Sequence, residues 1–299
     1  MILANCWTWD VDPVILPLWG PVQIRWYGVA FLGVFVGGHY LLRWQTLRAG
    51  RSEQVPTDFI NYGIVGVLAG AWFGHRLFYD WHEVVRNPLY LIDITKGLAG
   101  LSSHGATIGL ILSIALFARR QKIPIGEMYD RFSFAAALGS ALVRVGNLFN
   151  SEIGGTPTDK PWAVCMPRFE CDLRHFEYPC GVSPIPRHPS QIYEALMGFA
   201  VLGILWLVDR ASGGEKRPRW LMAGTFCVVY FTGRFYVEYT KEHQVFTDPS
   251  ATLDMGQYLS LPFVALGVAF IVYAFTKRLP AAGPLPPREP PTEPRTEGS

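Results

Sequence analysis

The chain has 299 residues, of which 50% are hydrophobic and 17% are charged, and its net charge is +2. Because an average soluble domain carries about 25% charged residues, this composition favours a membrane protein and excludes a disordered, collagen-like or soluble disulfide-framework chain. Basic and acidic side chains nearly balance, at 26 and 24, so nucleic acid is not expected as a partner.

Long apolar runs predict where the chain crosses a membrane. A transmembrane helix needs about 20 consecutive, mostly apolar residues. Seven runs approach that length, and they are Ile24–Leu42, Phe59–Leu77, Gly97–Ala118, Phe132–Phe149, Gln191–Val208, Trp220–Tyr236 and Leu259–Phe275. We therefore predict an all-α integral membrane protein with about seven transmembrane helices.

Basic residues alternate between the connections that join these runs. They gather after the first, third, fifth and seventh runs, at Arg43, Arg48, Arg51, Arg119, Arg120, Lys122, Arg210, Lys216, Arg217, Arg219, Lys277 and Arg278. The other connections contain few Lys or Arg residues. Because cytoplasmic loops of membrane proteins are enriched in these residues, the pattern predicts that the N-terminus lies outside and the C-terminus in the cytoplasm.

One long connection does not span the membrane. Ser151–Arg187, between the fourth and fifth spans, is rich in aromatic residues, and we expect it to fold into a small periplasmic head. Residues 1–278 then form the membrane domain. Residues 279–299 are dominated by Pro, Glu, Gly and Thr and are expected to form a disordered cytoplasmic tail.

The head contains three of the five cysteines, Cys165, Cys171 and Cys180. An oxidising outer compartment allows one disulfide among them and leaves one thiol over. Cys6 and Cys227 are expected to be unpaired. No Cys-x-x-Cys or His-x-x-His spacing occurs in the head, so no metal site is expected.

On this topology, ionisable side chains from six spans fall at the outer membrane boundary. They are Arg25, Tyr27, His75, Arg76, His104, Arg144, Glu194, Arg234 and Glu238. A single Arg near a helix end is commonly an anchor that reaches the membrane surface. However, a charge in hydrocarbon costs at least about 2.5 kcal/mol, so such groups normally face a cavity and pair with one another. Their common depth predicts a polar cavity open to the outer leaflet.

The segment Arg144–Gly155 has an unusual composition for a membrane helix end. It combines Arg144 with the amides of Asn147 and Asn150, the carboxylate of Glu152 and three glycines. These groups supply donors and acceptors for a phosphate-containing headgroup, and the glycines allow the backbone to approach it. The segment resembles the signature of bacterial prolipoprotein diacylglyceryl transferases, Gly-Arg-x-Gly-Asn-Phe-x-Asn-x-Glu-x-x-Gly. Val143 and Leu148 replace the first Gly and the Phe.

The resemblance to this family extends from about Pro21 to about Thr276. Five further blocks resemble family segments in the same order, and they are Ile24–Gly28, Gly100–Gly105, Pro186–Glu194, Gly233–Tyr239 and Met255–Pro262. Each block lies at an outer membrane boundary of the predicted topology. A single block is weak evidence, but several blocks in the same order as in the family make the resemblance specific.

The resemblance implies a reaction in the outer leaflet of the bacterial inner (plasma) membrane. The diacylglyceryl group of phosphatidylglycerol is transferred to the thiol of the lipobox cysteine in a prolipoprotein signal peptide, which forms a thioether and releases glycerol phosphate. The expected partners are phosphatidylglycerol, the prolipoprotein and membrane lipid, and the chain is expected to be a multi-pass monomer. No cofactor and no catalytic metal are expected.

The matching positions imply roles for individual residues. His104 is our prediction for the base, because a neutral imidazole accepts a thiol proton near neutral pH; its alternatives are a structural His or a phosphate contact. Arg144 and Arg234 present planar forks to phosphate oxygens. The catalytic set is predicted to be His104, Arg234, Tyr27 and Asn147.

The predicted substrate-binding set is larger. It comprises Arg144, Glu152, Asn150, Gly155, Glu238, Tyr230, Arg25, His188 and Gln191. Within it, Glu152 and Glu238 are expected to orient the guanidinium groups, and Tyr27, Tyr230, Asn147 and Asn150 to contact the glycerol of the headgroup. Gln191 and Glu194 have an alternative role as stabilisers of a helix start.

Two other function classes compete with a transferase. A transporter or channel would use the same charges as an outer vestibule, but its polar groups should continue through the midplane. Apart from His39, the inner halves of the spans appear apolar in sequence. An intramembrane protease would need paired acidic, Ser–Lys or His-x-x-x-His signatures in the spans, and these do not occur.

Overall fold

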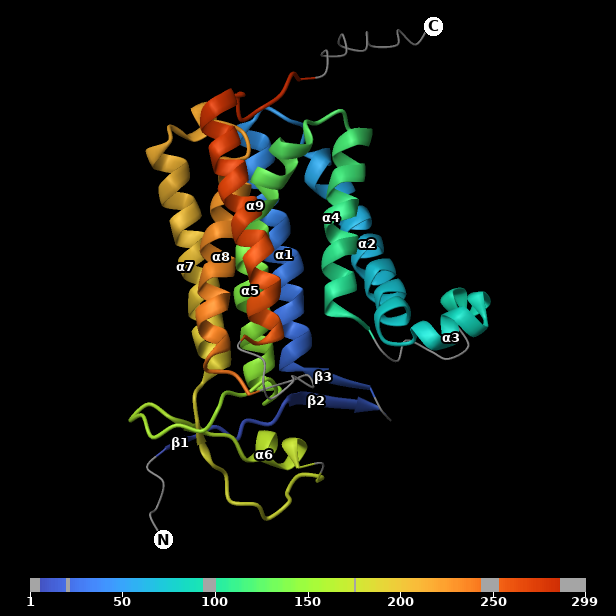
Figure 1. Ribbon diagram of the computed structural model, residues 1–299, viewed down its shortest axis with the longest axis vertical. Helices are drawn as coiled ribbons and strands as arrows, with labels where there is room; N and C mark the ends of the chain where they lie inside the picture. The colour runs from blue at the N-terminus through green and yellow to red at the C-terminus, as the bar shows by residue number, and fades with distance from the viewer. Residues whose placement is uncertain (1–5, 20–21, 94–100, 175, 243–252, 286–299) are drawn as a thin grey trace, which may run out of the picture.

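The computed structural model describes residues 6–19, 22–93, 101–174, 176–242 and 253–285, and most of them are helical (Figure 1). The long helices are α1 Trp26–Arg48, α2 Gln54–Phe78, α4 Ser103–Arg120, α5 Ile125–Phe149, α7 Ser190–Ala211, α8 Leu221–Glu238 and α9 Met255–Lys277. Helices α5, α7 and α9 are long and apolar enough to cross a membrane. The prediction of a mostly helical membrane protein is confirmed; the first residues of the third predicted run, 97–100, lie outside the described residues.

Glycines hold α2 and α4 close together. A Cβ built on Gly70 would lie 2.3 Å from the carbonyl oxygen of Gly105, and one built on Gly105 would lie 2.2 Å from that of Gly70. Gly74 and Gly109 extend the same contact by one turn in each direction. Small residues at this spacing let two membrane helices approach until their backbones touch.

The two ends of the bundle differ in structure, as Figure 1 shows. The head end carries short strands and helix α6, Pro167–Leu173, whereas the far end carries turns and the chain that follows α9. The α2–α4 pair joins the other helices near the far end, through an apolar cluster that includes Leu42, Val55, Phe117 and Met128.

The head end of the bundle contains strands that the all-α prediction lacked. The strands β1 Trp7–Thr8, β4 Val164–Cys165 and β5 Pro186–Arg187 form one small sheet, and β2 Val14–Trp19 pairs with β3 Val22–Arg25 as a hairpin. Helix α1 therefore begins at Trp26, and the predicted start of the first span at Ile24 was too early. The two-residue strands β1, β4 and β5 carry too little alternation of polar and apolar residues to be recognised in a sequence.

The head contains two disulfides, one within it and one that joins it to the N-terminal segment. Cys6 pairs with Cys165, and Cys171 pairs with Cys180. Cys171–Cys180 is the one disulfide expected among the three head cysteines. The expectation that the remaining thiol and Cys6 stay unpaired was wrong, because β1 pairs with β4 and brings the N-terminal segment against Val164–Cys165. Cys227 in α8 is free, as expected.

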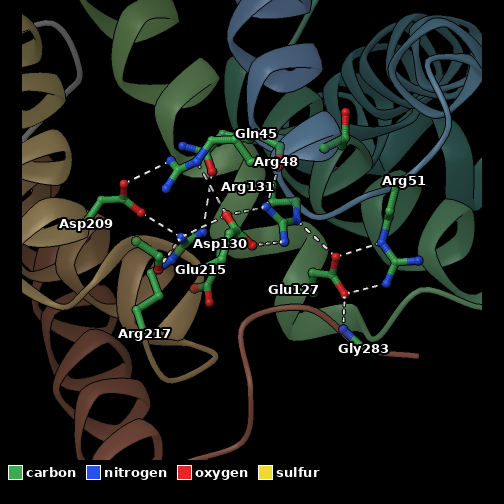
Figure 2. Close-up of polar contacts among 12 residues, drawn as sticks. Gln45, Arg48, Arg51, Glu127, Asp130, Arg131, Asp209, Glu215, Arg217 and Gly283 are labelled. Atoms are coloured by element: carbon green, nitrogen blue, oxygen red, sulfur yellow. Dashed lines mark hydrogen bonds and ion pairs between the residues drawn. The ribbon is translucent and has the colours of Figure 1, made fainter. Parts of the chain in front are cut away.

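A buried network of charges joins several elements at the far end (Figure 2). Arg131 of α5 donates to Glu127 at 3.0 Å and to Glu215 at 2.8 Å, and Arg217 donates to Asp209 at 2.6 Å. Arg131, Glu127, Arg217 and Asp209 are all at most 1% exposed. These residues lie outside the predicted spans, so the expectation for the inner halves of the spans is not contradicted. Helix α5 begins at Ile125, earlier than the predicted start at Phe132, and its extra turns carry Glu127 and Arg131, whose charges are neutralised in pairs.

The chain that follows α9 takes part in this network. The backbone N–H of Gly283 donates to Glu127 at 2.7 Å, the N–H of Arg219 donates to the carbonyl of Leu279, and Ala281 is 2% exposed. The start of the disordered tail was therefore predicted too early, at residue 279, because residues 279–285 pack against the bundle. Residues 286–299 lie outside the described residues.

Candidate active site

The polar cluster at the head end is centred on the carboxylate of Glu194, which is 1% exposed, near the start of α7. The Nε of Arg144, from α5, lies 3.1 Å from Glu194 Oε2. The Nη1 of Arg234, from α8, donates a hydrogen bond of 3.0 Å to Oε1. A buried carboxylate is tolerated when paired cations offset its loss of hydration. Three helices meet at this one group.

Two further charges extend the cluster. Lys241 Nζ, just beyond the end of α8, lies 3.7 Å from Glu194 Oε1 and 3.4 Å from Glu238 Oε2. Arg234 Nη2 lies 3.8 Å from the same Glu238 oxygen, which confirms the predicted pairing along α8. Burial lowers the pKa of Lys241 below its ordinary value, and the two carboxylates oppose that change. In this Glu194 cluster, three cations face two carboxylates, which favours an anionic ligand.

A chain of hydrogen bonds links Arg144 to the turn after α5. Arg144 Nη1 donates to Asn147 Oδ1 at 3.2 Å, and Asn147 Nδ2 donates to Glu152 Oε1 at 2.7 Å. Asn150 Nδ2 lies 3.5 Å from the same Glu152 oxygen. Glu152 therefore orients Asn147, which in turn orients the guanidinium group. The structure brings these predicted site residues together.

The turn that carries Glu152 has an unusual backbone. Ser151 and Ile153, on either side of Glu152, have φ angles of 52° and 59°. This left-handed region costs a residue with a side chain about 1–2 kcal/mol. Gln191 fixes the turn, because its fully buried amide donates to the carbonyl of Glu152 at 2.8 Å. Gln191 thus contacts the backbone of the site and does not act as a helix-start stabiliser.

Gly155 is surrounded by backbone and side chains of the head. A Cβ built on it would lie 2.3 Å from the carbonyl oxygen of His188 and 2.5 Å from Ser190 Oγ. Arg187 Nη1 donates to the carbonyl of Gly155 at 2.9 Å, and Arg187 Nε forms an ion pair with Glu170. The close packing gives a structural reason for glycine at this position.

Two tyrosines border the Glu194 cluster. Tyr230, from α8, lies close enough to Arg144, Arg234 and Glu194 for their charges to act on its hydroxyl. Tyr27, from α1, lies close enough to Arg144 and Glu152 for their charges to act on its hydroxyl. A Cβ on Gly146 would lie 2.9 Å from the ring of Tyr27, so this glycine lets the ring approach α5. Both predicted tyrosines therefore lie at the site.

Three further predicted site residues have side chains outside both the Glu194 cluster and the adjoining turn that carries Glu152. Arg25 is exposed and donates to Gln23 at 3.2 Å. His188 faces Tyr193 in the head, with Nδ1 3.2 Å from its hydroxyl. His104 is exposed in the first turn of α4, and among the described residues no hydrogen bond or ion pair joins it to the cluster.

The charges at the end of α2 have a different role. Arg76 is 2% exposed, stacks on Trp72 at 3.4 Å and donates to the carbonyl of Tyr90 at 3.0 Å. His75 Nε2 lies 3.6 Å from Asp80 Oδ2. These contacts hold α3, Trp81–Arg86, and the short helix η1, Pro88–Ile92. Thus α5, α7 and α8 supply the cluster, and not all six spans.

Sequence reasoning did not single out two residues that the structure places here. Lys241 lies in the cluster, and Arg187 fastens Gly155 to the head. Arg187 stands inside the Pro186–Glu194 block that resembles the family, so that block was the available signal. Lys241 lies three residues beyond Glu238, where one further helical turn places it beside that carboxylate.

The exposure of the two arginines determines what the cluster can bind. The side chains of Arg144 and Arg234 are 17% and 22% exposed, whereas Glu194 beneath them is buried. Their remaining N–H donors can therefore reach a ligand. Guanidinium groups fixed by a carboxylate are preorganised to bind phosphate oxygens in pairs.

Comparison with known proteins agrees with this geometry. The family model described as prolipoprotein diacylglyceryl transferase matches residues 13–273. The chain belongs to this family. A phosphatidylglycerol–prolipoprotein diacylglyceryl transferase of Chloroherpeton thalassium is 36% identical over 269 residues, which is 88% of this chain and 92% of the relative.

Other members of the family are similar over nearly their whole length. Proteins of the same name from Janthinobacterium sp. and Pseudomonas putida are each 34% identical, over 277 and 281 residues. These matches cover 89% and 92% of this chain, and 97% and 98% of the relatives. The resemblance inferred from the sequence blocks is confirmed, and the transporter or channel alternative has no support.

Proposed function

We propose that this chain transfers the diacylglyceryl group of phosphatidylglycerol to the thiol of a prolipoprotein lipobox cysteine, the first step of lipoprotein maturation. The observation that carries the proposal is the Glu194 cluster, in which two partly exposed guanidinium groups are fixed on one buried carboxylate. Such a pair suits a lipid phosphate. The names of relatives that match nearly the whole chain support the same reaction.

The placement in the membrane is part of this proposal. The seven long helices span the bacterial inner membrane, with the N-terminus and the head outside and the C-terminus in the cytoplasm, and the chain acts as a monomer. Basic residues at the far end, such as Arg43, Arg119, Lys216 and Lys277, support this orientation. The Glu194 cluster then lies at the level of the outer leaflet, where the substrate headgroup is found.

The chemistry is a displacement at a glyceryl carbon of the lipid. The peptide sulfur forms a C–S bond, the C–O bond to the phosphate breaks, and glycerol phosphate leaves with the electron pair. Arg144 and Arg234 bind the phosphate and stabilise the negative charge that it gains. Tyr27, Tyr230 and Asn150 contact the headgroup and hold it in line with the sulfur.

The thiol proton needs an acceptor, and His104 is our proposed base. Its side chain is exposed at the head end of α4, where an incoming peptide can reach it. Ser102 caps this helix by accepting from Gly105 N–H at 3.2 Å, which fixes the first turn and the position of His104 within it. A free thiol has a pKa near 8.5, so a modest base suffices.

The function is tested with purified protein in detergent. Phosphatidylglycerol and a lipobox peptide should together give glycerol phosphate and a lipidated peptide. A matched peptide with Ser in place of the Cys should give neither product. Release of glycerol phosphate at the same rate with both peptides, or with none, would contradict the proposed transfer.

The role of His104 has its own expected result. His104→Gln should lower turnover at neutral pH, and the activity should recover as the pH rises toward the thiol pKa of about 8.5, because solvent then removes the proton. Initial rates between pH 6 and 9, compared with the native chain, measure this. A loss that is equal at every pH would indicate a phosphate contact or a structural role.

A further inference from the structure

A second candidate binding site lies in the half of the bundle away from the head. A cavity of about 390 Å³ opens between α1, α5 and α7, and it is lined by Leu41, Trp44, Phe134, Phe199, Leu202, Gly203 and Trp206. All of these residues are apolar. A Cβ built on Gly203 meets no atom within 4 Å, so open space lies over this glycine. The volume is within the range of about 300–1,000 Å³ for small-molecule pockets.

The lining residues form two rows that end in arginines. Helix α1 contributes Leu41, Trp44 and Arg48, and α7 contributes Phe199, Leu202, Gly203, Trp206 and Arg210. Spacings of three and four residues place each row on one helix face. The guanidinium of Arg48 lies 4.8 Å from the ring of Trp44, and that of Arg210 lies 4.8 Å from the ring of Trp206. Both helices run from the head end to the far end, so both arginines mark the same end of the groove.

The length of the groove matches one leaflet of a bilayer. Phe199 and Arg210 are eleven residues apart on α7, which corresponds to about 16 Å along the helix axis. The hydrocarbon core of a bilayer is about 30 Å thick. A chain that starts at Arg210 and follows the groove therefore ends near the midplane, as the acyl chain of a lipid does.

The charges at the end of the groove favour an anionic headgroup. Arg48 Nη1 lies 2.9 Å from Asp209 Oδ2, and the same buried carboxylate also pairs with Arg217. In contrast, Arg210 is exposed, and no carboxylate in the described part of the chain forms an ion pair with it. Arg210 therefore carries a positive charge that these residues do not neutralise.

We propose that this groove binds an anionic glycerophospholipid of the cytoplasmic leaflet, with one acyl chain over Gly203 and the phosphate on Arg210. Arg48 flanks the phosphate on the α1 side. The site is at the opposite end of the bundle from the Glu194 cluster, so its lipid is not the substrate of the transfer. The proposal requires the membrane placement described above, but it does not require the transferase activity.

Native mass spectrometry of the full chain tests this site. The probe is phosphatidylserine, compared with phosphatidylcholine of the same acyl chains, because phosphatidylglycerol would also bind as substrate. All variants carry Arg144→Ala, which weakens the outer site. We expect Gly203→Phe, which fills the groove, and Arg210→Gln each to weaken retention of phosphatidylserine about fivefold. Leu207→Phe, on an exposed face of α7 outside the groove, and Arg120→Gln, at the end of α4, are the matched controls and should leave it unchanged.

The same experiment distinguishes other occupants of the groove. Equal retention of phosphatidylcholine and phosphatidylserine by the parent chain would overturn the proposal, as would equal retention by the groove variants and their controls. A dimer that disappears in Gly203→Phe would identify a second copy of the chain as the occupant and would also overturn it. Arg210→Gln changes an exposed side chain, so it provides the test even where Gly203→Phe does not fold.

Discussion

Replacing Arg144 or Arg234 by Ala is expected to lower transferase turnover at least about tenfold while the protein still inserts into the membrane, because each change removes donors from the charge that develops on the leaving phosphate. Both side chains are partly exposed above the buried Glu194, so each loss falls mainly on ligand binding and less on packing. Rates of glycerol phosphate release, with phosphatidylglycerol and a lipobox peptide, measure the effect.

Arg86→Ala is the matched control for these two variants. Arg86 lies in the described segment α3 near the head end, its side chain is 76% exposed, and it pairs with Glu83. Exposed ion pairs of this kind contribute little, so turnover should remain close to that of the native chain. Native rates for both Arg144→Ala and Arg234→Ala would refute the proposed phosphate site.

The sequence predicted the parts of the site that depend on one helix. Arg234 and Glu238 are four residues apart, and the structure places them within 3.8 Å. Arg144 and Asn147 are three apart and share a hydrogen bond. Helical periodicity fixes such neighbours before any tertiary contact forms. The long apolar runs likewise predicted the positions of the long helices, because a bilayer requires uninterrupted apolar surface.

The central role of Glu194 could not be predicted in this way. Its partners Arg144 and Arg234 lie on two other helices, and their contact depends on how closely α5 and α7 pack. Gly198 sets that distance, because a Cβ built on it would lie 2.7 Å from the backbone nitrogen of Ala141. The sequence shows the glycine, but it does not show which helix the glycine meets.

The contacts that the sequence did not predict have a common physical origin. Cys6 and Cys165 are 159 residues apart, and their pairing follows from strand contacts too short to leave a pattern. Among the buried charges at the far end, Arg217 was counted as a basic residue of a connection, and the sequence did not show that it pairs with Asp209 on α7. Sequence alone shows that a charge is present, whereas only the fold shows whether it is paired.

Replacing Glu194 by Ala is expected to reduce both stability and turnover. The change leaves three cations, Arg144, Arg234 and Lys241, without their shared carboxylate. Breaking a buried ion pair from one side costs about 3–5 kcal/mol, so the midpoint of thermal unfolding in detergent should fall. Turnover should fall as well, because the two guanidinium groups lose the carboxylate that fixes their positions relative to each other.

A second variant, Asp209→Ala, separates the loss of stability from the loss of turnover. Asp209 lies on the same helix α7, is 1% exposed and also pairs with two arginines, Arg48 and Arg217, but at the far end. Both variants should therefore lose comparable stability. If Glu194 positions the phosphate-binding arginines, only Glu194→Ala lowers the rate per folded molecule, and Glu194→Gln, which keeps the shape but not the charge, lowers it too. Equal rates per folded molecule for Glu194→Ala and Asp209→Ala would reduce Glu194 to a structural residue, since the two substitutions differ chiefly in which end of the bundle loses its carboxylate.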